Sequence, residues 1–179
     1  GRAAAAVARH AVELLGGRYG RRVVVVAGKG NNGNDGREAA RRLRRRGVRV
    51  VVIAATDTPE RVPECDLVID AAYGTGFRGE YEPPDVGDVP VLAVDIPSGV
   101  DGLTGAVGGR ALRARRTVTF AALKPGLLFQ PGRALAGEVA LEDIGLDTSG
   151  AGIGVVEATD VAGWLPPRLP DAHKWRAAV

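Results

Sequence analysis

The stretch that decides the fold is VVVVAGKGNNGNDG, residues 23–36. Its first five residues, Val23 to Ala27, are all apolar, and an apolar run without alternating polar residues predicts a strand buried on both faces. A turn rich in Gly and Asn follows, and Gly36 to Arg46 then predicts a helix that ends at Gly47. A second apolar run, Val48 to Ala55, completes a strand–helix–strand unit, whose right-handed crossover makes the two strands parallel.

The same alternation continues on both sides of this unit. Residues 3–15 (AAAAVARHAVELL) predict a helix because Ala is the best helix former, and His10 on it is expected to be a surface or packing residue. Further strands are predicted at Leu67 to Ala71, Val91 to Val94, Arg116 to Ala121 and Glu138 to Leu141, with Ile153 to Val156 as a short edge strand. Buried strands that alternate with helices predict an α/β fold with an open, doubly wound sheet.

Composition excludes several classes of protein. The chain has 179 residues, 45% of them hydrophobic and 25% charged, which suits one globular domain. Its apolar runs are too short to span a bilayer, and no signal peptide is visible, so no membrane partner is expected. A single cysteine, Cys65, cannot form an internal disulfide; with a position just before a strand it is expected to be a buried thiol. We therefore expect a cytoplasmic protein.

The basic residues give only weak support for nucleic-acid binding. The formal net charge is +3, and Arg41, Arg42, Arg44, Arg45 and Arg46 form a run within the second predicted helix. The run fits the exposed side of a helix whose Leu43 turns inward. No aromatic residues accompany it, so no nucleic-acid partner is expected.

Polar residues gather after the first predicted strand, where open parallel sheets bind ligands. Gly28, Gly30 and Gly33 fit G-x-G-x-x-G, a spacing that lets backbone N–H groups approach a pyrophosphate at a helix N-terminus. The same turn holds Asn31, Asn32, Asn34 and Asp35. The alternative interpretation is helix capping by Asn32 or Asn34, although a cap needs only one such residue.

Two further strands end in carboxylates, in DAAYGTGFRGE (residues 70–80) and DIPSGVD (residues 95–101). Burying a carboxylate at the end of a strand costs desolvation free energy unless something binds it. The alternative to a binding site is a plain loop for the first segment and a simple turn for the second. Asp70, Asp95, Asn32 and Ser98 together would bring oxygen ligands to one cleft. Such a set suits a monovalent or weakly bound cation rather than zinc, which prefers Cys and His. Lys124, in ALKPG, is either a positive charge near this edge or an ordinary exposed lysine.

Four segments then carry a family resemblance. GKGNNGNDG, DAAYGTGFRGE, VDIPSGVD and TFAALKPGLLFQPG resemble, in this order, the motifs of NAD(P)HX epimerases, the YjeF N-terminal-domain family, over Val23 to Gly145. The resemblance implies a Rossmann-like three-layer α/β/α sandwich with a mainly parallel, doubly wound sheet. It also implies an isomerase that interconverts the R and S forms of hydrated NADH and NADPH (NADHX and NADPHX), with one potassium ion per subunit, and a homodimer.

The resemblance also assigns roles to residues. It implies that Asp95 is catalytic and that Asn32, Asp70 and Ser98 bind the metal ion. The substrate-binding residues that it implies are Asn31, Asn32, Gly33, Asn34, Asp35, Gly74, Thr75, Gly76, Phe77, Arg78, Gly79, Glu80 and Asp95. Asn34 stands where the family usually has Gly, and Asn tolerates left-handed backbone geometry better than most residues.

The end of the chain differs in composition. Trp164 to Pro170 (WLPPRLP) is rich in Pro and is not expected to be regular structure. We expect an epimerase domain at residues 1–163, followed at residues 164–179 by a Pro-rich linker and the start of another domain. Asp171 to Lys174 resemble the opening of the ADP- or ATP-dependent dehydratase domain that is fused to the epimerase in many bacteria. The chain begins at Gly1 and has no Met, so a fragment is expected.

Other functions remain as alternatives. A hemiaminal can be inverted if a carboxylate moves a proton, which is the role expected of Asp95. An NAD(P)-dependent oxidoreductase would account for the glycine spacing, with Asp57 holding a ribose, but not for four Asn and Asp residues in the turn. A non-catalytic nucleotide-binding or interaction module is the third interpretation.

Overall fold

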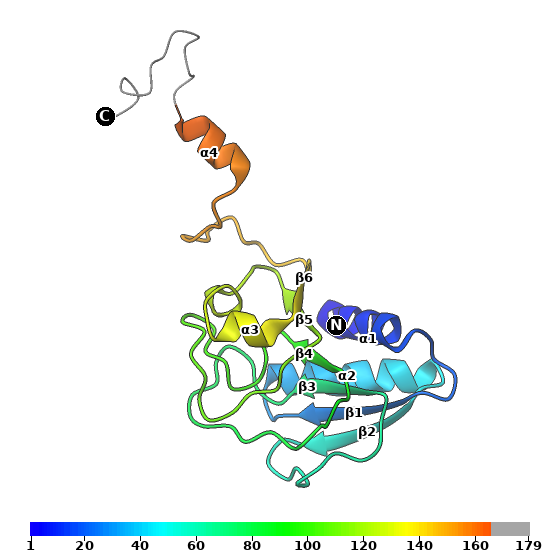
Figure 1. Ribbon diagram of the computed structural model, residues 1–179. Coiled ribbons are helices and arrows are strands. Elements are labelled where there is room, and N and C mark those ends of the chain that lie inside the picture. The colour runs from blue at the N-terminus through cyan, green and yellow to red at the C-terminus, as the bar shows by residue number, and fades with distance from the viewer. Residues whose placement is uncertain (166–179) are drawn as a thin grey trace. The chain divides into compact units, whose positions relative to one another are not determined.

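Six strands form one sheet in the order β2-β1-β3-β4-β5-β6 (Figure 1). The computed structural model describes residues 1–165, and every pair of neighbouring strands in it is parallel. The strands are β1 (Arg22–Ala27), β2 (Arg49–Ala54), β3 (Leu67–Ala71), β4 (Val91–Val94), β5 (Arg116–Phe120) and β6 (Glu138–Glu142). Because the winding reverses between β1 and β3, a topological switch point lies there, as in other doubly wound folds. The predicted Rossmann-like α/β fold is confirmed.

The valine run of β1 packs on both faces of the sheet. Val23 and Val25 belong to the apolar core on one face, and Val24 and Val26 to the core on the other. All four are at most 1% exposed. The period-two alternation of a strand thus divides one continuous apolar run between two cores, as the sequence predicts.

The two faces of the sheet are covered differently. Helices α1 (Arg2–Leu15) and α2 (Asn31–Arg45) pack against each other over one face (Figure 1). On the other face, a core around Ile96, Val100, Leu127 and Ala136 is built from loops and two short helices, η1 (Pro125–Leu127) and α3 (Gly132–Ala136). The second outer layer consists mainly of loops because most strands are joined without a long helix.

Helix α2 begins earlier than predicted. The expected start was Gly36, but the helix begins at Asn31, and Gly30 is its N-cap without any side-chain cap bond. The capping interpretation of Asn32 or Asn34 is therefore wrong. Both residues lie near the start of the helix, where the helix dipole favours acidic side chains, and Asp35 lies just beyond the first turn.

The predictions for the C-terminal part also need correction. A compact unit spans Gly1–Asp147, and a second unit begins at Thr148. Ile153 to Val156 is not a strand; these residues are exposed and form no strand pairing. The second unit instead holds α4 (Ala158–Trp164), which begins with a capping box formed by Glu157 and Asp160. Trp164 therefore ends a helix, and the rest of the predicted Pro-rich linker beyond Leu165 lies outside the described residues.

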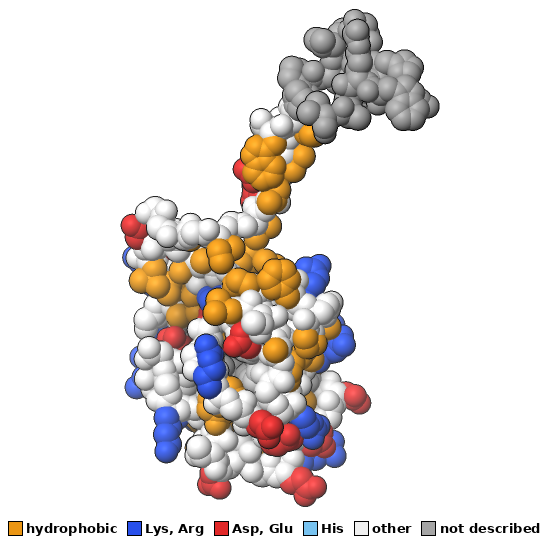
Figure 2. Space-filling view, turned by 90° about the vertical axis from the view of Figure 1, so that its left-hand side faces the viewer, with side chains coloured by type: hydrophobic (Ala, Val, Ile, Leu, Met, Phe, Trp, Pro, Cys, Tyr) orange, Lys and Arg blue, Asp and Glu red, His pale blue; other side chains and the backbone are white. Residues whose placement is uncertain are grey.

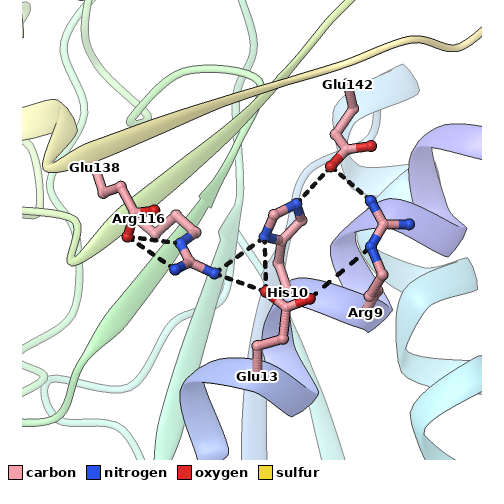
Figure 3. A network of polar contacts seen from close by, with 6 residues as sticks. All are labelled: Arg9, His10, Glu13, Arg116, Glu138 and Glu142. Atoms are coloured by element: carbon pink, nitrogen blue, oxygen red, sulfur yellow. Dashed lines mark hydrogen bonds and ion pairs between the residues drawn. The ribbon is translucent and has the colours of Figure 1, made fainter.

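A polar network ties α1 to the β5–β6 side of the sheet (Figure 3). His10 is 8% exposed, and its Nε2 lies 2.7 Å from Glu142 Oε1. Its Nδ1 lies 3.1 Å from an Arg116 guanidinium nitrogen, and Arg116 also pairs with Glu13 and Glu138. His10 is thus a buried packing residue, one of the two expected roles.

The arginine run lies on the outer side of α2. Leu43 is fully buried, as predicted, whereas Arg41, Arg42 and Arg45 pair with Glu38. Nearby carboxylate charge therefore offsets part of the basic run. Within residues 1–165, no helix combines the length and apolar character needed to cross a bilayer.

Candidate functional site

A cavity of about 780 Å³ opens at the carboxyl edge of the sheet, next to the switch point. This size is typical of ligand pockets in proteins. Figure 2 looks onto this edge, where hydrophobic, acidic and basic side chains lie close together. The cavity is lined by Gly30, Asn31, Asn32, Asp35, Ala72, Tyr73, Gly74, Thr75, Gly76, Phe77, Arg78, Asp95, Phe120, Lys124, Ile144 and Leu146.

A buried carboxylate and a hydroxyl lie behind the cavity. Asp70 is the last residue but one of β3 and Ser98 follows β4, and both side chains are fully buried. The Ser98 hydroxyl donates to Asp70 Oδ1 at 2.5 Å, and the Ser98 backbone N–H donates to Oδ2 at 2.9 Å. Burial raises the pKa of Asp70, and the Ser98 hydrogen bonds oppose that rise. Burying the Asp70 carboxylate therefore costs free energy, and hydrogen bonds from Ser98, in the loop after the neighbouring strand, offset part of that cost.

Asn32 adds an oxygen without a partner to the same region. Its Nδ2 donates to the Tyr73 carbonyl at 2.9 Å, which fixes the orientation of the amide. Asn32 Oδ1 is then buried and has no hydrogen-bond partner among the described residues. The Tyr73 carbonyl oxygen also lies 3.2 Å from Ser98 Oγ, so it connects Asn32 with the Ser98–Asp70 pair. The three predicted metal ligands, Asn32, Asp70 and Ser98, therefore come together around one carbonyl group.

Asp95 also lines the cavity and directly follows β4. Its Oδ1 is 2.6 Å from Lys124 Nζ, and both side chains are 19% exposed. Its backbone has a φ of 68°, which is uncommon for a residue other than Gly. A second carboxyl, Asp35, lines the cavity from α2, and burial raises its pKa. The charge of Asp95 adds to that rise.

Two aromatic residues that line the cavity, Tyr73 and Phe77, form one wall of the site, and Tyr81, which packs on Tyr73, is not part of the lining. Tyr73 and Phe77 stack with their ring centroids 4.1 Å apart, and Tyr81 meets Tyr73 edge-on at 5.1 Å. The Tyr81 hydroxyl is buried without a hydrogen-bond partner among the described residues, and burial raises its pKa. This wall gives the cavity a flat apolar surface beside its carboxylates, which suits a planar ring.

The glycines of the first turn allow close backbone packing. A Cβ at Gly28 would lie 1.8 Å from the Ala72 carbonyl oxygen, and one at Gly33 would lie 1.9 Å from the Gly28 carbonyl oxygen. By contrast, a Cβ at Gly30 would meet nothing within 4 Å. Gly28 and Gly33 thus let the β1–α2 turn pack on the loop after β3, which brings Asn32 beside Tyr73.

Most of the predicted substrate residues line the cavity, but not all. Asn31, Asn32, Asp35, residues 74–78 and Asp95 do so. Gly33 is buried in the turn, and Gly79 and Glu80 lie beyond the lining. Asn34 is exposed and faces a separate hollow beside Arg37 and Arg41.

The cavity also contains residues that sequence reasoning did not select. Tyr73 lies within a quoted motif, and an aromatic residue beside a Gly-rich loop was the signal for it. The sequence gives no signal for Phe120, Ile144 and Leu146. No local pattern shows that the end of β5, where Phe120 lies, and the chain after β6 reach this edge of the sheet. Lys124 is not an ordinary exposed lysine, because it pairs with Asp95. Asp57, the residue required by the oxidoreductase alternative, is exposed and does not line the cavity.

Comparisons with known proteins agree with this architecture. The chain is 38% identical over 201 residues to the bifunctional NAD(P)H-hydrate repair enzyme Nnr of Mycobacterium tuberculosis, which covers 97% of this chain and 41% of that protein. It is 36% identical over 154 residues to the NAD(P)H-hydrate epimerase of Limosilactobacillus fermentum, which covers 68% of this chain and 74% of that protein. The chain thus spans about two fifths of the bifunctional relatives that it matches.

A solved structure supports the fold, and a family model identifies the family. The crystal structure of yeast ynu0 superposes with a TM-score of 0.55 at 22% identity, over 69% of this chain and 70% of that one, which supports the fold. The family model described as YjeF-related protein N-terminus matches residues 1–65 and 54–126, the part that contains β1 to β5 and the turns around the cavity. The chain belongs to the YjeF N-terminal-domain family.

Proposed function

We propose that this domain interconverts the R and S epimers of hydrated NADH and NADPH at C6 of the nicotinamide ring. The observation that carries the proposal is the cavity at the switch point, which is lined both by the Asp95 carboxylate and by an aromatic wall, the stacked rings of Tyr73 and Phe77. The relatives named NAD(P)H-hydrate epimerase support the choice of substrate. The wall would hold the nicotinamide ring, and the carboxylate would lie at the reacting carbon.

The reaction requires one proton to be moved and then returned. In one route the C6–O bond breaks, the hydroxyl leaves as water after gaining a proton, and water adds again to the other face of a ring cation. In the other route the hydroxyl loses its proton, the C6–N bond breaks to give an aldehyde, and the ring nitrogen takes the proton. Closure on the opposite face reverses either set of steps. Both routes need a group that exchanges a proton beside C6.

Asp95 is placed for this exchange, and Asp35 for assisting it. As a carboxylate paired with Lys124, Asp95 would accept the proton and stabilise positive charge on the ring. Asp35 lines the same cavity, and burial raises its pKa, so its environment differs from that of Asp95. Two carboxyl groups in different environments are the usual arrangement for acid and base roles.

The residues behind the cavity fit a potassium ion. Asn32 Oδ1 is buried without a hydrogen-bond partner among the described residues, and the amide of the same side chain bonds the Tyr73 carbonyl, which Ser98 Oγ and its partner Asp70 also adjoin. One carboxylate with neutral oxygens suits a monovalent cation better than a divalent one. When bound, the ion would neutralise Asp70 and order the loops that hold the substrate. Asn32, Asp70 and Ser98 would hold it.

The experiment that tests the function uses one purified epimer of hydrated NADH. The protein is added in potassium buffer, and the appearance of the other epimer is followed by chromatography. We expect equilibration much faster than the spontaneous reaction without protein. Equal rates with and without protein would refute the proposal. NADH with a ketone serves as the parallel assay, since turnover there would favour an oxidoreductase.

The proposal also includes fusion to a second domain and formation of a homodimer. The bifunctional relatives support fusion to a dehydratase domain in the natural chain. The homodimer remains a prediction, and sedimentation of the protein at several concentrations tests it.

A further inference from the structure

The Lys124 ammonium group is fully occupied by protein atoms. Its Nζ lies 2.6 Å from Asp95 Oδ1, and it donates to Thr119 Oγ1 at 2.9 Å and to the Phe120 carbonyl at 2.8 Å. An ammonium has three N–H donors, so these three acceptors use all of them. Although Lys124 lines the cavity, it has no N–H group left for a ligand.

Asp95 is held on one side only. Its Oδ1 accepts from Lys124 Nζ and, at 3.3 Å, from the Thr119 hydroxyl. Its Oδ2 makes no hydrogen bond with the described residues and points toward Gly74, where a Cβ would lie 3.8 Å away. One oxygen is thus fixed by β5 and Lys124, and the other faces the cavity.

The same unusual turn ends both strands that carry this pair. The Ile96 N–H donates to the Val94 carbonyl at 2.9 Å around Asp95, whose φ is 68°. The Ala122 N–H donates to the Phe120 carbonyl at 2.7 Å around Ala121, whose φ is 64°. A three-residue turn with a positive central φ is the rare and strained form of the γ-turn.

These two turns stand apart from the rest of the backbone. Within residues 1–165, Asp95 and Ala121 are the two residues other than Gly with a positive φ. They directly follow β4 and β5, which are neighbours in the sheet. Strain of this kind persists where the surrounding structure requires it, and it clusters at functional sites. Here the first turn directs Asp95 over the sheet edge, and the second returns the chain so that Lys124 reaches Asp95.

We infer that Lys124 is a positioning residue that, with Thr119 and the paired γ-turns, holds Asp95 Oδ1 so that Oδ2 is aimed at the reacting atom. The inference rests on the proposed function, because it assigns Lys124 a role through Asp95. It differs from a direct role for Lys124 on the substrate, since the ammonium has no free donor. It also differs from a purely stabilising ion pair, which would change folding without changing the rate of a folded enzyme.

The first test is kinetic. Lys124→Met keeps a stem of similar length but loses all three hydrogen bonds, and we expect kcat to fall by about tenfold to a hundredfold with KM changed by less than about threefold. Lys124→Arg keeps the charge, yet its planar group cannot meet the same three acceptors, so its rate should stay low. Arg133→Met, which removes an exposed charge on α3, is the control and should keep the full rate.

The second test asks whether Lys124 acts through Asp95. The double variant Asp95→Asn with Lys124→Met should be no slower than Asp95→Asn alone, because the two residues act as one unit. Multiplied effects in the double variant, or a rate like that of the unchanged protein for Lys124→Arg, would overturn the inference. Melting curves show whether each variant is folded, and Thr119→Val replaces Lys124→Met if the latter is not.

The third test does not depend on activity. A crystal structure of Lys124→Met should show the Asp95 carboxylate turned away from its present position, whereas the same carboxylate position would overturn the inference. If the unchanged protein does not epimerise hydrated NADH, the proposed function fails, but this structure still decides whether Lys124 positions Asp95.

Discussion

His10 Nε2 lies 2.7 Å from Glu142 Oε1, which joins the first helix of the chain to its last strand (Figure 3). Arg9 donates to the same oxygen at 2.5 Å. The loops around the cavity follow strands in between, and Ile144 and Leu146 line the cavity just after Glu142. This contact therefore fixes where the chain returns to the site.

Replacing Glu142 by Gln should destabilise the fold at neutral pH by about 1–2 kcal/mol, because two charge-assisted or buried hydrogen bonds weaken. The bonds from Arg9 and His10 lower the pKa of Glu142. A carboxyl group whose pKa is lower in the folded protein than in the unfolded chain stabilises the fold at any pH above its unfolded pKa. That contribution is lost as the pH falls through the pKa of the folded state. The difference between the variant and the unchanged protein should thus shrink below about pH 4.

Urea unfolding at several pH values measures this difference. Glu82→Gln is the matched control, because Glu82 forms only an exposed ion pair with Arg110 at 3.6 Å and should cost less than about 0.5 kcal/mol. Equal stability of Glu142→Gln and the unchanged protein at pH 7 would contradict the assigned role of the network.

Replacing Gly28 by Ala should destabilise the domain by at least about 2 kcal/mol, because its Cβ would lie 1.8 Å from the Ala72 carbonyl oxygen. Gly30→Ala is the control in the same turn; its Cβ meets nothing within 4 Å, so we expect a cost of about 1 kcal/mol or less. Thermal unfolding of both variants measures the contrast. Similar losses would mean that close packing of the turn is not what requires Gly28.

Potassium should raise the melting temperature more than lithium at equal ionic strength. Binding to the folded state adds about 2.7 kcal/mol at a hundredfold excess over Kd. Asn32→Ala should abolish the difference between the two salts, since Asn32 Oδ1 is a buried oxygen without a partner among residues 1–165. Asn34→Ala, which faces away from the cavity, should keep it. Equal melting in both salts would count against the proposed ion.

Asp95→Asn should slow epimerisation by at least about a hundredfold, since general acid–base groups typically contribute ~10²–10⁴-fold. Asn keeps the shape and a hydrogen bond but does not exchange a proton near neutral pH, so folding and dinucleotide binding should persist. Rates are taken after subtraction of the spontaneous reaction. A near-normal rate above that background would move the role to Asp35, the other carboxyl that lines the cavity.

Ending the chain after Asp147 should change the melting temperature by less than about 4 °C, which corresponds to about 1 kcal/mol for a domain of this size. The compact unit spans Gly1–Asp147, and residues 148–165 are exposed. Calorimetry of the shortened and full chains measures this. A larger drop would show that the C-terminal part belongs to the same folding unit and would favour the domain end predicted at residue 163.

Several features follow from the sequence alone. The valine run of β1, the two-residue period that buries it on both faces, and the glycines of the turn predict a parallel sheet with a ligand site at its carboxyl edge. The grouping of Asn32, Asp70 and Ser98 is also predictable, because all three follow strand or turn ends at that edge. These features depend on local pattern and on the rule that parallel strands end together.

Other features were decided only by tertiary structure. The pairing of Lys124 with Asp95 depends on two strained turns that leave no mark in composition or period. The return of Ile144 and Leu146 to the cavity depends on the contact between His10 and Glu142, whose partners are distant in sequence. Asn34 faces away from the cavity because α2 begins at Asn31, and the helical period then turns successive side chains to different sides. Local pattern predicts which strand end carries a polar residue, but the direction of its side chain is set by long-range packing.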